Sequence, residues 1–269
     1  MRTIGVIAGK GIYPETFIEA ARKQAEELRI VLVAFKGETD PALEAQADST
    51  IWIKVGQLGK MGNFLKKEAV PEAVMVGQIT PSNLFNLQPD LRTIAMLAKL
   101  KEKNAESIFS AIADEMSKDG VTILSALTFL DQHMAPEGHI AGPSLKKEQE
   151  DDATYGIKIA KSTSELDIGQ SVVVRQGTVL AVEAFEGTNK CIQRGGDLGK
   201  GKHCLLAKVS KPNQDLRFDV PVIGPDTVKN CAEAGVNAIV VEAHKTLILD
   251  KPHLEKLAKE LNISVIGLA

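Results

Sequence analysis

Residues 4–14 read Ile-Gly-Val-Ile-Ala-Gly-Lys-Gly-Ile-Tyr-Pro. The apolar run Ile4–Ala8 predicts a buried strand that stops at the Gly-Lys-Gly turn. Pro14 can open a helix that reaches about Leu28, and Ile30–Phe35 resumes as a second strand. This order of strand, helix and strand predicts a βαβ unit, and therefore a parallel sheet at the start of the chain.

The remainder of the first half repeats this alternation. Strands are predicted at Ile51–Ile53, Val74–Val76 and Val121–Leu124, and helices at Leu91–Lys103 and Glu106–Lys118. Alternating strands and helices are typical of a parallel sheet with helices on its faces. We therefore expect a Rossmann-like domain in the first half.

A change of composition between about Met134 and Ala153 predicts a domain boundary. This stretch is rich in Pro and Gly, contains the charged run Lys146–Asp152 and has little apolar periodicity. We expect an N-terminal domain at 1–133, a linker at 134–153 and a C-terminal domain at 154–269.

The second half predicts a mixed α/β domain. Its expected elements are a hairpin of Gln170–Arg175 and Thr178–Phe185, strands at Cys204–Val209, Leu216–Val220, Ala238–Ala243 and Ile263–Gly267, and helices at Pro225–Ala234 and about Pro252–Leu261. Pro225 at a helix start and Gly235 just past a helix end support the first of these helices. The fold class expected for the whole chain is α/β, with two domains.

Composition limits the classes of function. The 269 residues are 44% hydrophobic, carry a net charge of −3 and contain no basic block, so a nucleic-acid partner is not expected. The three cysteines have no CxxC spacing, which predicts reduced thiols and a cytoplasmic protein. No apolar stretch approaches the ~20 residues of a spanning helix, so any membrane contact is expected to be peripheral.

The segment Lys211–Pro225 carries an unusual density of charge. If Leu216–Val220 is extended, Asp215, Arg217 and Asp219 point to one face, and the two carboxylates lie roughly 13 Å apart. They cannot then share one metal ion. We assign Asp219 to a metal ion or a water and Asp215 to an ion pair with Arg217 or Lys211; the simpler alternative is a ladder of charges on an exposed strand.

Other oxygen ligands are expected from Glu186 and Glu242, which fall at predicted strand ends. An all-oxygen set suits Mg²⁺ or Mn²⁺, and no histidine spacing supports zinc. Gly187 and Thr188 follow Glu186 and offer N–H groups and a hydroxyl to a ligand, although a solvated hairpin end with a glycine for its backbone is the alternative that the residues alone favour. The chain has no recognisable nucleophile motif, which favours direct attack by water.

The turn Gly9-Lys10-Gly11 would present backbone N–H groups and a helix N-terminus to an anion. A plain tight turn is the alternative, because Pro14 replaces the third glycine of a dinucleotide fingerprint. The run from Arg194 to His203 predicts a mobile basic loop, which either contacts a phosphate or, as we favour, stays solvated.

Four stretches carry a family resemblance: Ile4–Pro14, Asp167–Val174, Val179–Thr188 and Lys211–Gly224. In order and spacing, over nearly the whole chain, they are similar to the LpxI family of UDP-2,3-diacylglucosamine pyrophosphatases. Lys10, Asn189 and His244 stand where the family commonly has other residues.

The resemblance implies hydrolysis of UDP-2,3-diacylglucosamine to UMP and 2,3-diacylglucosamine 1-phosphate, a step of lipid A synthesis, with water attacking the α-phosphorus. It also implies a Mg²⁺-dependent homodimer, with Asp219 as the catalytic aspartate. Together, residues and resemblance assign the following roles: Asp219 catalytic; Asp219 and Glu186 at the metal; and Gly9, Lys10, Gly11, Gly187, Thr188, Lys211, Gln214 and Arg217 at the substrate.

Two other functions remain open at this point. The N-terminal βαβ unit suits a nucleotide- or dinucleotide-dependent enzyme, and a non-catalytic carrier of nucleotide or lipid is the third possibility. Two acyl chains need a large apolar groove, since each buried methylene contributes ~0.8 kcal/mol. Leu84, Phe85, Leu87 and Leu91 are candidates to line the groove, and ordinary core positions are the alternative for them.

Overall fold

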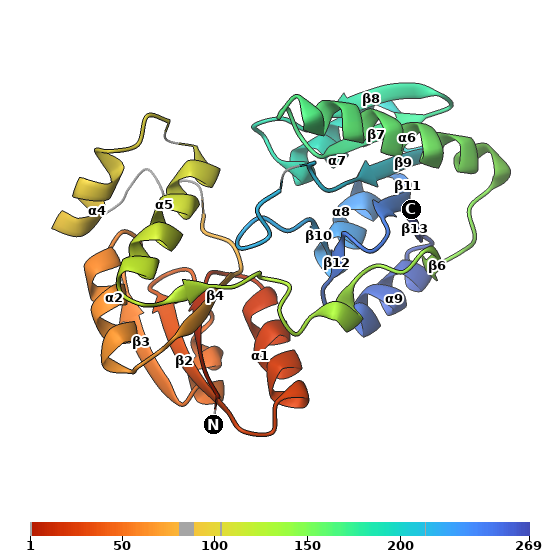
Figure 1. Cartoon of the computed structure of the whole chain (residues 1–269). Helices are drawn as coiled ribbons and strands as arrows, with labels where there is room; N and C mark the ends of the chain where they lie inside the picture. The colour runs from red at the N-terminus through yellow and green to blue at the C-terminus, as the bar shows by residue number, and fades with distance from the viewer. Residues whose placement is uncertain (1, 81–88, 103, 213) are drawn as a thin grey trace. The chain divides into compact units, whose positions relative to one another are not determined.

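The chain folds into two compact units, as the computed structural model shows for residues 2–80, 89–102, 104–212 and 214–269 (Figure 1). Unit 1 comprises Met1–Asp131 together with Asp215–Asp219. Unit 2 comprises Gln132–Gln214 and Val220–Ala269. The short segment Asp215–Asp219 therefore belongs to the first unit although both of its flanks belong to the second.

Unit 1 is built on a parallel sheet of five strands in the order β3-β2-β1-β4-β5. The strands are β1 (Arg2–Ala8), β2 (Leu28–Phe35), β3 (Ser49–Ile53), β4 (Glu72–Val76) and β5 (Thr122–Ile123). The predicted βαβ opening and the Rossmann-like parallel sheet are confirmed. The strand order reverses between β1 and β4, which is the point where open α/β sheets commonly bind ligands.

Helices cover both faces of this sheet, with α1 on one side and α2 on the other (Figure 1). They are α1 (Tyr13–Gln24), α2 (Leu58–Lys67), α4 (Leu91–Leu97) and α5 (Ala105–Lys118), and the 3₁₀ turns are η1 (Pro41–Gln46) and η2 (Asp131–His133). Ile7, Val31 and Val33 pack in one cluster with side chains of α2, α4 and α5. Val6, Ile30 and Leu32, which alternate with them, are also fully buried, as a sheet covered on both faces requires.

Unit 2 has a mixed sheet of six strands in the order β6-β13-β11-β9-β7-β8, as predicted in kind. Its strands are β6 (Gly138–Ala141), β7 (Ser171–Arg175), β8 (Thr178–Val182), β9 (Cys204–Lys208), β11 (Val236–Glu242) and β13 (Ser264–Leu268), and a separate parallel pair is formed by β10 (Val222–Ile223) and β12 (Leu247–Ile248). Strands β9, β11 and β13 are parallel, and β6 and β7 are antiparallel to their neighbours. The hairpin of β7 and β8 is confirmed.

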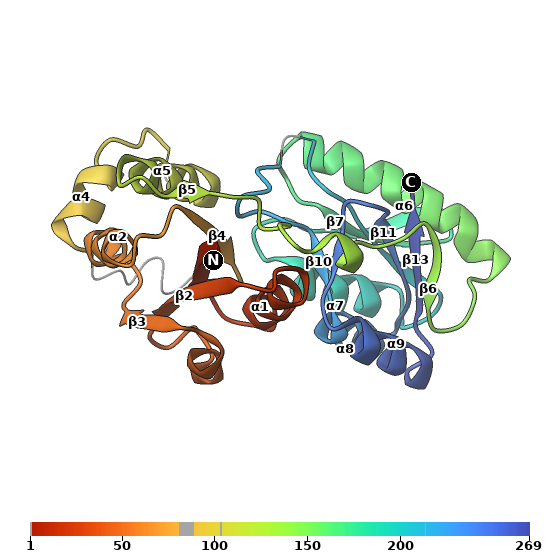
Figure 2. The ribbon, with the colours of Figure 1, turned by 60° about the horizontal axis from the view of Figure 1, so that its bottom comes forward.

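The sheet of unit 2 lies between two helical layers (Figure 2). The helices are α6 (Lys147–Glu165) on one face, and α7 (Thr188–Leu198), α8 (Pro225–Ala234) and α9 (Lys251–Glu260) on the other. Paired Val173, Leu206 and Ile239 pack toward α7–α9, while their alternating neighbours Val172 and Ala207 pack toward α6. Successive side chains of a strand point to opposite faces of the sheet, and both faces are covered by helices. These strands are therefore continuously apolar.

The stretch predicted as a linker, 134–153, differs from that expectation because it contains β6 and the first residues of α6. The apolar residues of α6 that are fully buried against the sheet are small, Ala153, Gly156 and Ala160, and the larger Tyr155, Ile157 and Ile159 pack there only partly buried. Small buried residues give a weak apolar periodicity, and the charged first turn hides the helix further.

The basic loop predicted at Arg194 to His203 is also different, because Arg194, Gly195 and Gly196 lie inside α7. A side chain at Gly195 would overlap Val173 on β7, and one at Gly196 would overlap the carbonyl oxygen of Ala234 on α8. The glycines that suggested a loop are therefore there to let a helix approach a strand and a second helix closely.

Replacing Gly196 with alanine is expected to destabilise unit 2 by about 1–3 kcal/mol, although alanine normally favours a helix, because the new methyl group meets backbone. Urea unfolding measures the change. Gln193→Ala, at an exposed position of the same helix, is the control and should stay within about 0.5 kcal/mol of wild type. A Gly196→Ala protein as stable as that control would contradict the close packing of α7 on α8.

Candidate active site

Residues Asp215–Asp219 form a tight turn, and the predicted strand Leu216–Val220 is wrong. The N–H groups of Phe218 and Asp219 both donate to the carbonyl oxygen of Asp215, at 3.2 and 2.9 Å. The Asp215 carboxylate accepts from the backbone N–H of Arg217 at 3.1 Å and from its guanidinium at 2.6–3.1 Å. An aspartate that bonds to the backbone two residues ahead favours a turn over a strand, which explains the difference.

The turn settles one of the alternatives left open by the sequence, since Asp215 pairs with Arg217 and not with Lys211. Hydrogen bonds from Arg217 hold the pKa of Asp215 below its ordinary value. The Arg217 guanidinium therefore stabilises the turn through its hydrogen bonds to Asp215. Its carbon Cζ also lies 5.7 Å from the centre of the Phe218 ring. Its predicted role as a substrate contact stays a prediction.

The turn is seated on unit 1 by two contacts. The Ala126 N–H donates to the carbonyl oxygen of Leu216 at 2.7 Å. The Phe218 ring stacks on Phe109 of α5 with centroids 5.5 Å apart, an arrangement that contributes about 0.5–1.5 kcal/mol beyond burial. Asp219 directly follows this anchored ring and is half-buried.

Phe218 also lines an apolar cavity of ≈ 100 Å³ in unit 1. The cavity lies between the carboxyl ends of the strands and helices α2, α4 and α5. Its largest lining side chains include Phe35, Met61, Met75, Met96, Phe109 and Phe218. Three methionines give such a wall flexible, polarisable surface that adapts to a flexible apolar ligand.

In the turn Gly9-Lys10-Gly11, the amides of Gly9 and Lys10 are not presented to a ligand as predicted, and the role of Gly11 stays a prediction. The Gly9 N–H donates to Val76 at 2.8 Å, and Lys10 and Gln78 exchange two backbone hydrogen bonds of 2.8 and 3.1 Å. These bonds join the ends of β1 and β4 at the point where the strand order reverses, so the amides of Gly9 and Lys10 are unavailable to a phosphate. The reading as a dinucleotide-binding turn loses its main support.

The side chain of Lys10 instead joins a polar cluster at the same edge of the sheet. Its Nζ donates to Thr80 Oγ1 at 3.1 Å. The Thr80 N–H and hydroxyl in turn donate to the buried carboxylate of Glu38, at 3.1 and 3.0 Å. The ammonium group of Lys10 is thus held at the carboxyl edge of the unit 1 sheet by the side chain of Thr80, which in turn bonds to Glu38. The sequence had predicted backbone N–H groups as the donors at this edge.

In unit 2, Thr188 begins α7 and lies beside two buried charged side chains that the sequence analysis did not assign to the site. Its hydroxyl donates to Glu183 Oε1 at 2.8 Å and accepts from Lys208 Nζ at 3.3 Å. The second oxygen of Glu183 is buried and has no hydrogen-bond partner among the described residues. Lys208 ends an otherwise apolar buried strand, and a lysine in that place is the signal that could have revealed it.

The segment after β9 is held by the side chain of Gln214. Gln214 Oε1 accepts from the Lys211 N–H at 2.9 Å and from the Ser210 hydroxyl at 2.8 Å. Lys211 Nζ pairs with Asp167 at 2.6 Å. Four of the predicted substrate residues therefore lie in unit 2: Gly187, Thr188, Lys211 and Gln214. They follow β8 and β9, which both run antiparallel to β7 and so end at the same edge of the sheet.

Glu186 forms an ion pair with Arg194 of α7. Hydrogen bonds from the backbone, and then from Arg194, lower the pKa of Glu186. Gly187 follows with a positive φ of 84° and leads directly into α7, so Glu186 and Gly187 lie in a loop before a helix, and the alternative of a solvated hairpin end is wrong. No three His, Cys, Asp or Glu side chains gather into a metal-binding group within residues 2–80, 89–102, 104–212 and 214–269.

The three thiols offer no nucleophile. Cys191, Cys204 and Cys231 are free and buried, as predicted for a reduced protein. Burial raises the pKa of Cys191 to about 12 and raises the pKa of the other two thiols. A thiol with a raised pKa is a poor nucleophile at neutral pH.

Glu242, at the end of β11, anchors the segment after β9. Its buried carboxylate accepts from the Ser210 N–H at 3.0 Å and pairs with Lys161 and Lys245, each at 2.7 Å. Burial would raise the pKa of Glu242, but these bonds outweigh it and place the pKa below the ordinary value. This full set of partners makes Glu242 a structural anchor in place of the oxygen ligand that was expected.

Glu242→Gln is therefore expected to destabilise the protein by about 1–3 kcal/mol at pH 7, because two lysines lose their partner. Since its pKa is lowered on folding, the contribution of Glu242 is complete above about pH 4.3 and is lost as the pH falls through the lowered value. Urea unfolding at a series of pH values should show the two proteins converging in acid. Glu255→Gln, which breaks an exposed ion pair, is the control; a gap equal to that control, or one that persists in acid, would contradict this role.

Comparison with known proteins finds relatives for both units of the chain. Residues 3–133 match the family model of the LpxI N-terminal domain, and residues 136–266 match that of the LpxI C-terminal domain. The chain is also 31% identical to the UDP-2,3-diacylglucosamine pyrophosphatase LpxI of Caulobacter vibrioides, over an alignment that covers 100% of this chain and 98% of that protein. On these matches, which span both units, the chain belongs to the LpxI family.

Proposed function

We propose that this chain is a UDP-2,3-diacylglucosamine pyrophosphatase that releases UMP and 2,3-diacylglucosamine 1-phosphate in lipid A synthesis. The relative from Caulobacter vibrioides carries that activity in its name and aligns along the full chain. The substrate joins a diphosphate to two acyl chains, so an enzyme for it needs a polar reacting centre beside an apolar site.

One observation carries the proposal: Phe218 lines the apolar cavity and the next residue is Asp219. The stacking of Phe218 on Phe109 fixes this neighbourhood within unit 1. We assign the cavity to acyl chain and Asp219 to the reacting phosphate. Of the residues suggested earlier for an acyl groove, Leu84, Phe85 and Leu87 lie outside the described residues, and Leu91 is exposed and so is not a core position.

In the proposed reaction, the oxygen of a water forms a bond to the α-phosphorus while the bond from that phosphorus to the bridging oxygen breaks. The sugar phosphate leaves, and the water gives up a proton to Asp219 or to solvent. The Asp219 carboxylate orients the water or binds a metal ion, and the turn around Asp215 keeps Asp219 at one position.

We propose Mg²⁺, or Mn²⁺, as the cofactor. When bound, such an ion neutralises charge on the phosphoryl oxygens and lowers the pKa of a bound water. Mg²⁺ commonly takes only one or two protein carboxylates and completes its shell with water and substrate phosphates, and an aspartate such as Asp219 suits that donor set. Glu186 can bind the metal ion only if its carboxylate leaves the ion pair that it forms with Arg194.

For the nucleotide, we propose the carboxyl edge of the unit 2 sheet. The hydroxyl of Thr188 and the cations Lys208 and Lys211 are donors suited to phosphate and ribose oxygens, and the second oxygen of Glu183 is an acceptor suited to a hydroxyl. Phe185, whose side chain is 98% exposed, offers a ring on which a base can stack.

We further propose a cytoplasmic homodimer in peripheral contact with the membrane that holds its lipid substrate. The homodimer rests on the family resemblance alone. None of the described helices is long and apolar enough to cross a membrane. The outer side of α4 exposes Leu91 and Ile94, and exposed Lys99 and Lys101 follow it, which is the combination that favours an anionic lipid surface.

Asp219→Ala is expected to reduce UMP release from UDP-2,3-diacylglucosamine about a thousandfold, since one lost charge contact at the phosphate is worth ~4 kcal/mol. A chelator should abolish release by the wild type, and added Mg²⁺ should restore it. Asp226→Ala, at an exposed position of α8, is the matched control and should keep wild-type activity. Activity that survives Asp219→Ala would move the catalytic role to another residue, and an inactive wild type would refute the proposed function.

Replacing Leu91 and Ile94 together with serine is expected to reduce binding to vesicles of phosphatidylethanolamine and phosphatidylglycerol about tenfold, because two exposed apolar side chains no longer enter the lipid. Flotation of the protein with vesicles measures this. Leu166→Ser with Ile168→Ser is the control, since these side chains are 72% and 47% exposed, against 85% and 51% for Leu91 and Ile94. Equal losses in the two double variants would exclude α4 as the membrane contact.

A further inference from the structure

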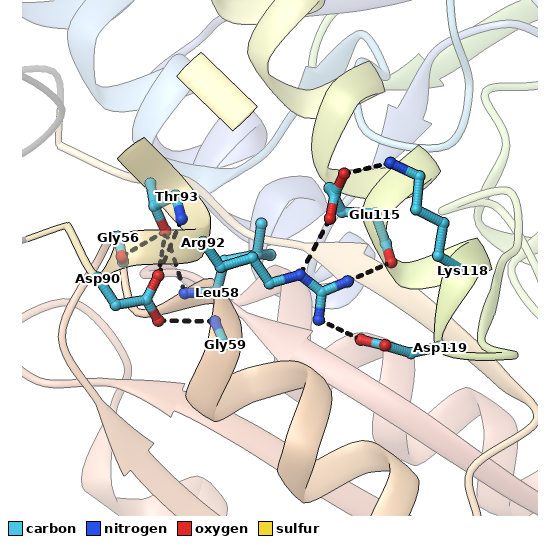
Figure 3. A network of polar contacts seen from close by, with 9 residues as sticks. All are labelled: Gly56, Leu58, Gly59, Asp90, Arg92, Thr93, Glu115, Lys118 and Asp119. Atoms are coloured by element: carbon cyan, nitrogen blue, oxygen red, sulfur yellow. Dashed lines mark hydrogen bonds and ion pairs between the residues drawn. The ribbon is translucent and has the colours of Figure 1, made fainter. Parts of the chain in front are cut away.

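Helix α4 has only seven residues, so its position must be set by its neighbours. It nevertheless supplies Thr93, Met96 and Leu97 to the wall of the apolar cavity. Two sets of polar contacts, which we call ties, join α4 to the other helices that line the cavity (Figure 3). The tie at Asp90 reaches α2, and the tie at Arg92 reaches α5.

The tie at Asp90 links α4 to the start of α2. One oxygen of Asp90 accepts from the N–H and the hydroxyl of Thr93, both at 2.9 Å, and so caps α4. The other oxygen accepts from the Gly59 N–H at 2.7 Å, in the first turn of α2. The single hydroxyl proton of Thr93 is shared between the Asp90 carboxylate and the Gly56 carbonyl oxygen, which lies 2.6 Å from the hydroxyl oxygen. One carboxylate and one threonine thus fix the N-terminal ends of both helices.

The tie at Arg92 links α4 to the last turns of α5. Its Nε donates to the Glu115 carboxylate at 3.0 Å and its Nη2 to the Glu115 carbonyl at 2.7 Å, while Nη1 pairs with Asp119. Lys118 holds Glu115 from the other side (Figure 3). A guanidinium that bonds to two carboxylates and a carbonyl is held in one orientation, which fixes the spacing of the two helices it joins.

The cavity lies between the helices that these ties join. Leu58 and Met61 of α2, Met96 and Leu97 of α4, and Phe109 and Ile112 of α5 all line it. We infer that Arg92, through Glu115 and Asp119, sets the width of this cavity and is a positioning residue for the choice of acyl-chain length. This inference rests on the proposed function, because it takes the cavity to be the acyl site.

Unit 1 contains a matched ion pair that does not touch the cavity. Arg29 of β2 pairs with Glu68, at the end of α2, and bonds to its carbonyl at 3.1 Å, just as Arg92 bonds to both the carboxylate and the carbonyl of Glu115. The two arginine side chains are 26% and 25% exposed. Neither Arg29 nor Glu68 lines the cavity, so Arg29→Met controls for general loss of an ion pair.

The experiment compares wild type, Arg92→Met and Arg29→Met on UDP-2,3-diacylglucosamines with short and with long acyl chains. We expect the ratio of kcat/KM for the long chain to that for the short chain to change about tenfold in Arg92→Met, or ~1.4 kcal/mol, through KM and with kcat nearly unchanged. Arg29→Met should keep the wild-type ratio. An unchanged ratio in Arg92→Met, or an equal change in Arg29→Met, would overturn the inference.

A titration that measures the binding of saturated fatty acids of increasing length tests this inference separately from the proposed function. If the wild type hydrolyses none of the substrates, the proposed function fails, and the titration alone then decides the role of Arg92. A length preference that is lost in Arg92→Met and kept in Arg29→Met supports the role, and the same preference in all three proteins refutes it. If Arg92→Met does not fold, Asp119→Asn, which leaves the bonds to Glu115 in place, is measured instead with the same expected direction.

Discussion

The carboxylate of Asp215 determines how the candidate active site is built. It accepts hydrogen bonds from the backbone and the guanidinium of Arg217 and so closes the turn that these residues form. The turn brings Phe218 onto Phe109 and leaves Asp219 as the next residue. The apolar cavity and the proposed catalytic residue Asp219 therefore lie next to each other. Their proximity depends on one local interaction, between residues two positions apart in the sequence.

The fold was largely accessible from the sequence because buried strands and well-capped helices have strong local signals. Helix α8 shows this well, since Pro225 and Gly235 mark its two ends and the structure agrees at both. Helices α6 and α7 were missed because several of the residues on their packed faces are glycine or alanine, whose role appears only when the neighbouring strand or helix is present.

The candidate site was harder to predict, for physical reasons. Alternation along Leu216–Val220 suggested a strand, but the side chain of Asp215 competes for the backbone and prevails. At Gly9-Lys10-Gly11 the residue types suit an anion, yet the amides of Gly9 and Lys10 are taken by a partner almost seventy residues away. Long-range partners of this kind leave no trace in a single sequence.

The segment Asp215–Asp219 also bears on how the protein is made. Residues up to Asp131 contain every strand of the unit 1 sheet, and the ribosome completes them well before Phe218 is synthesised. During that interval the sheet and its helices can form, but the cavity lacks the ring that stacks on Phe109. Unit 1 must therefore wait, with an apolar opening exposed, until most of unit 2 has left the ribosome. A chaperone that shields apolar surface would have this interval in which to act on unit 1.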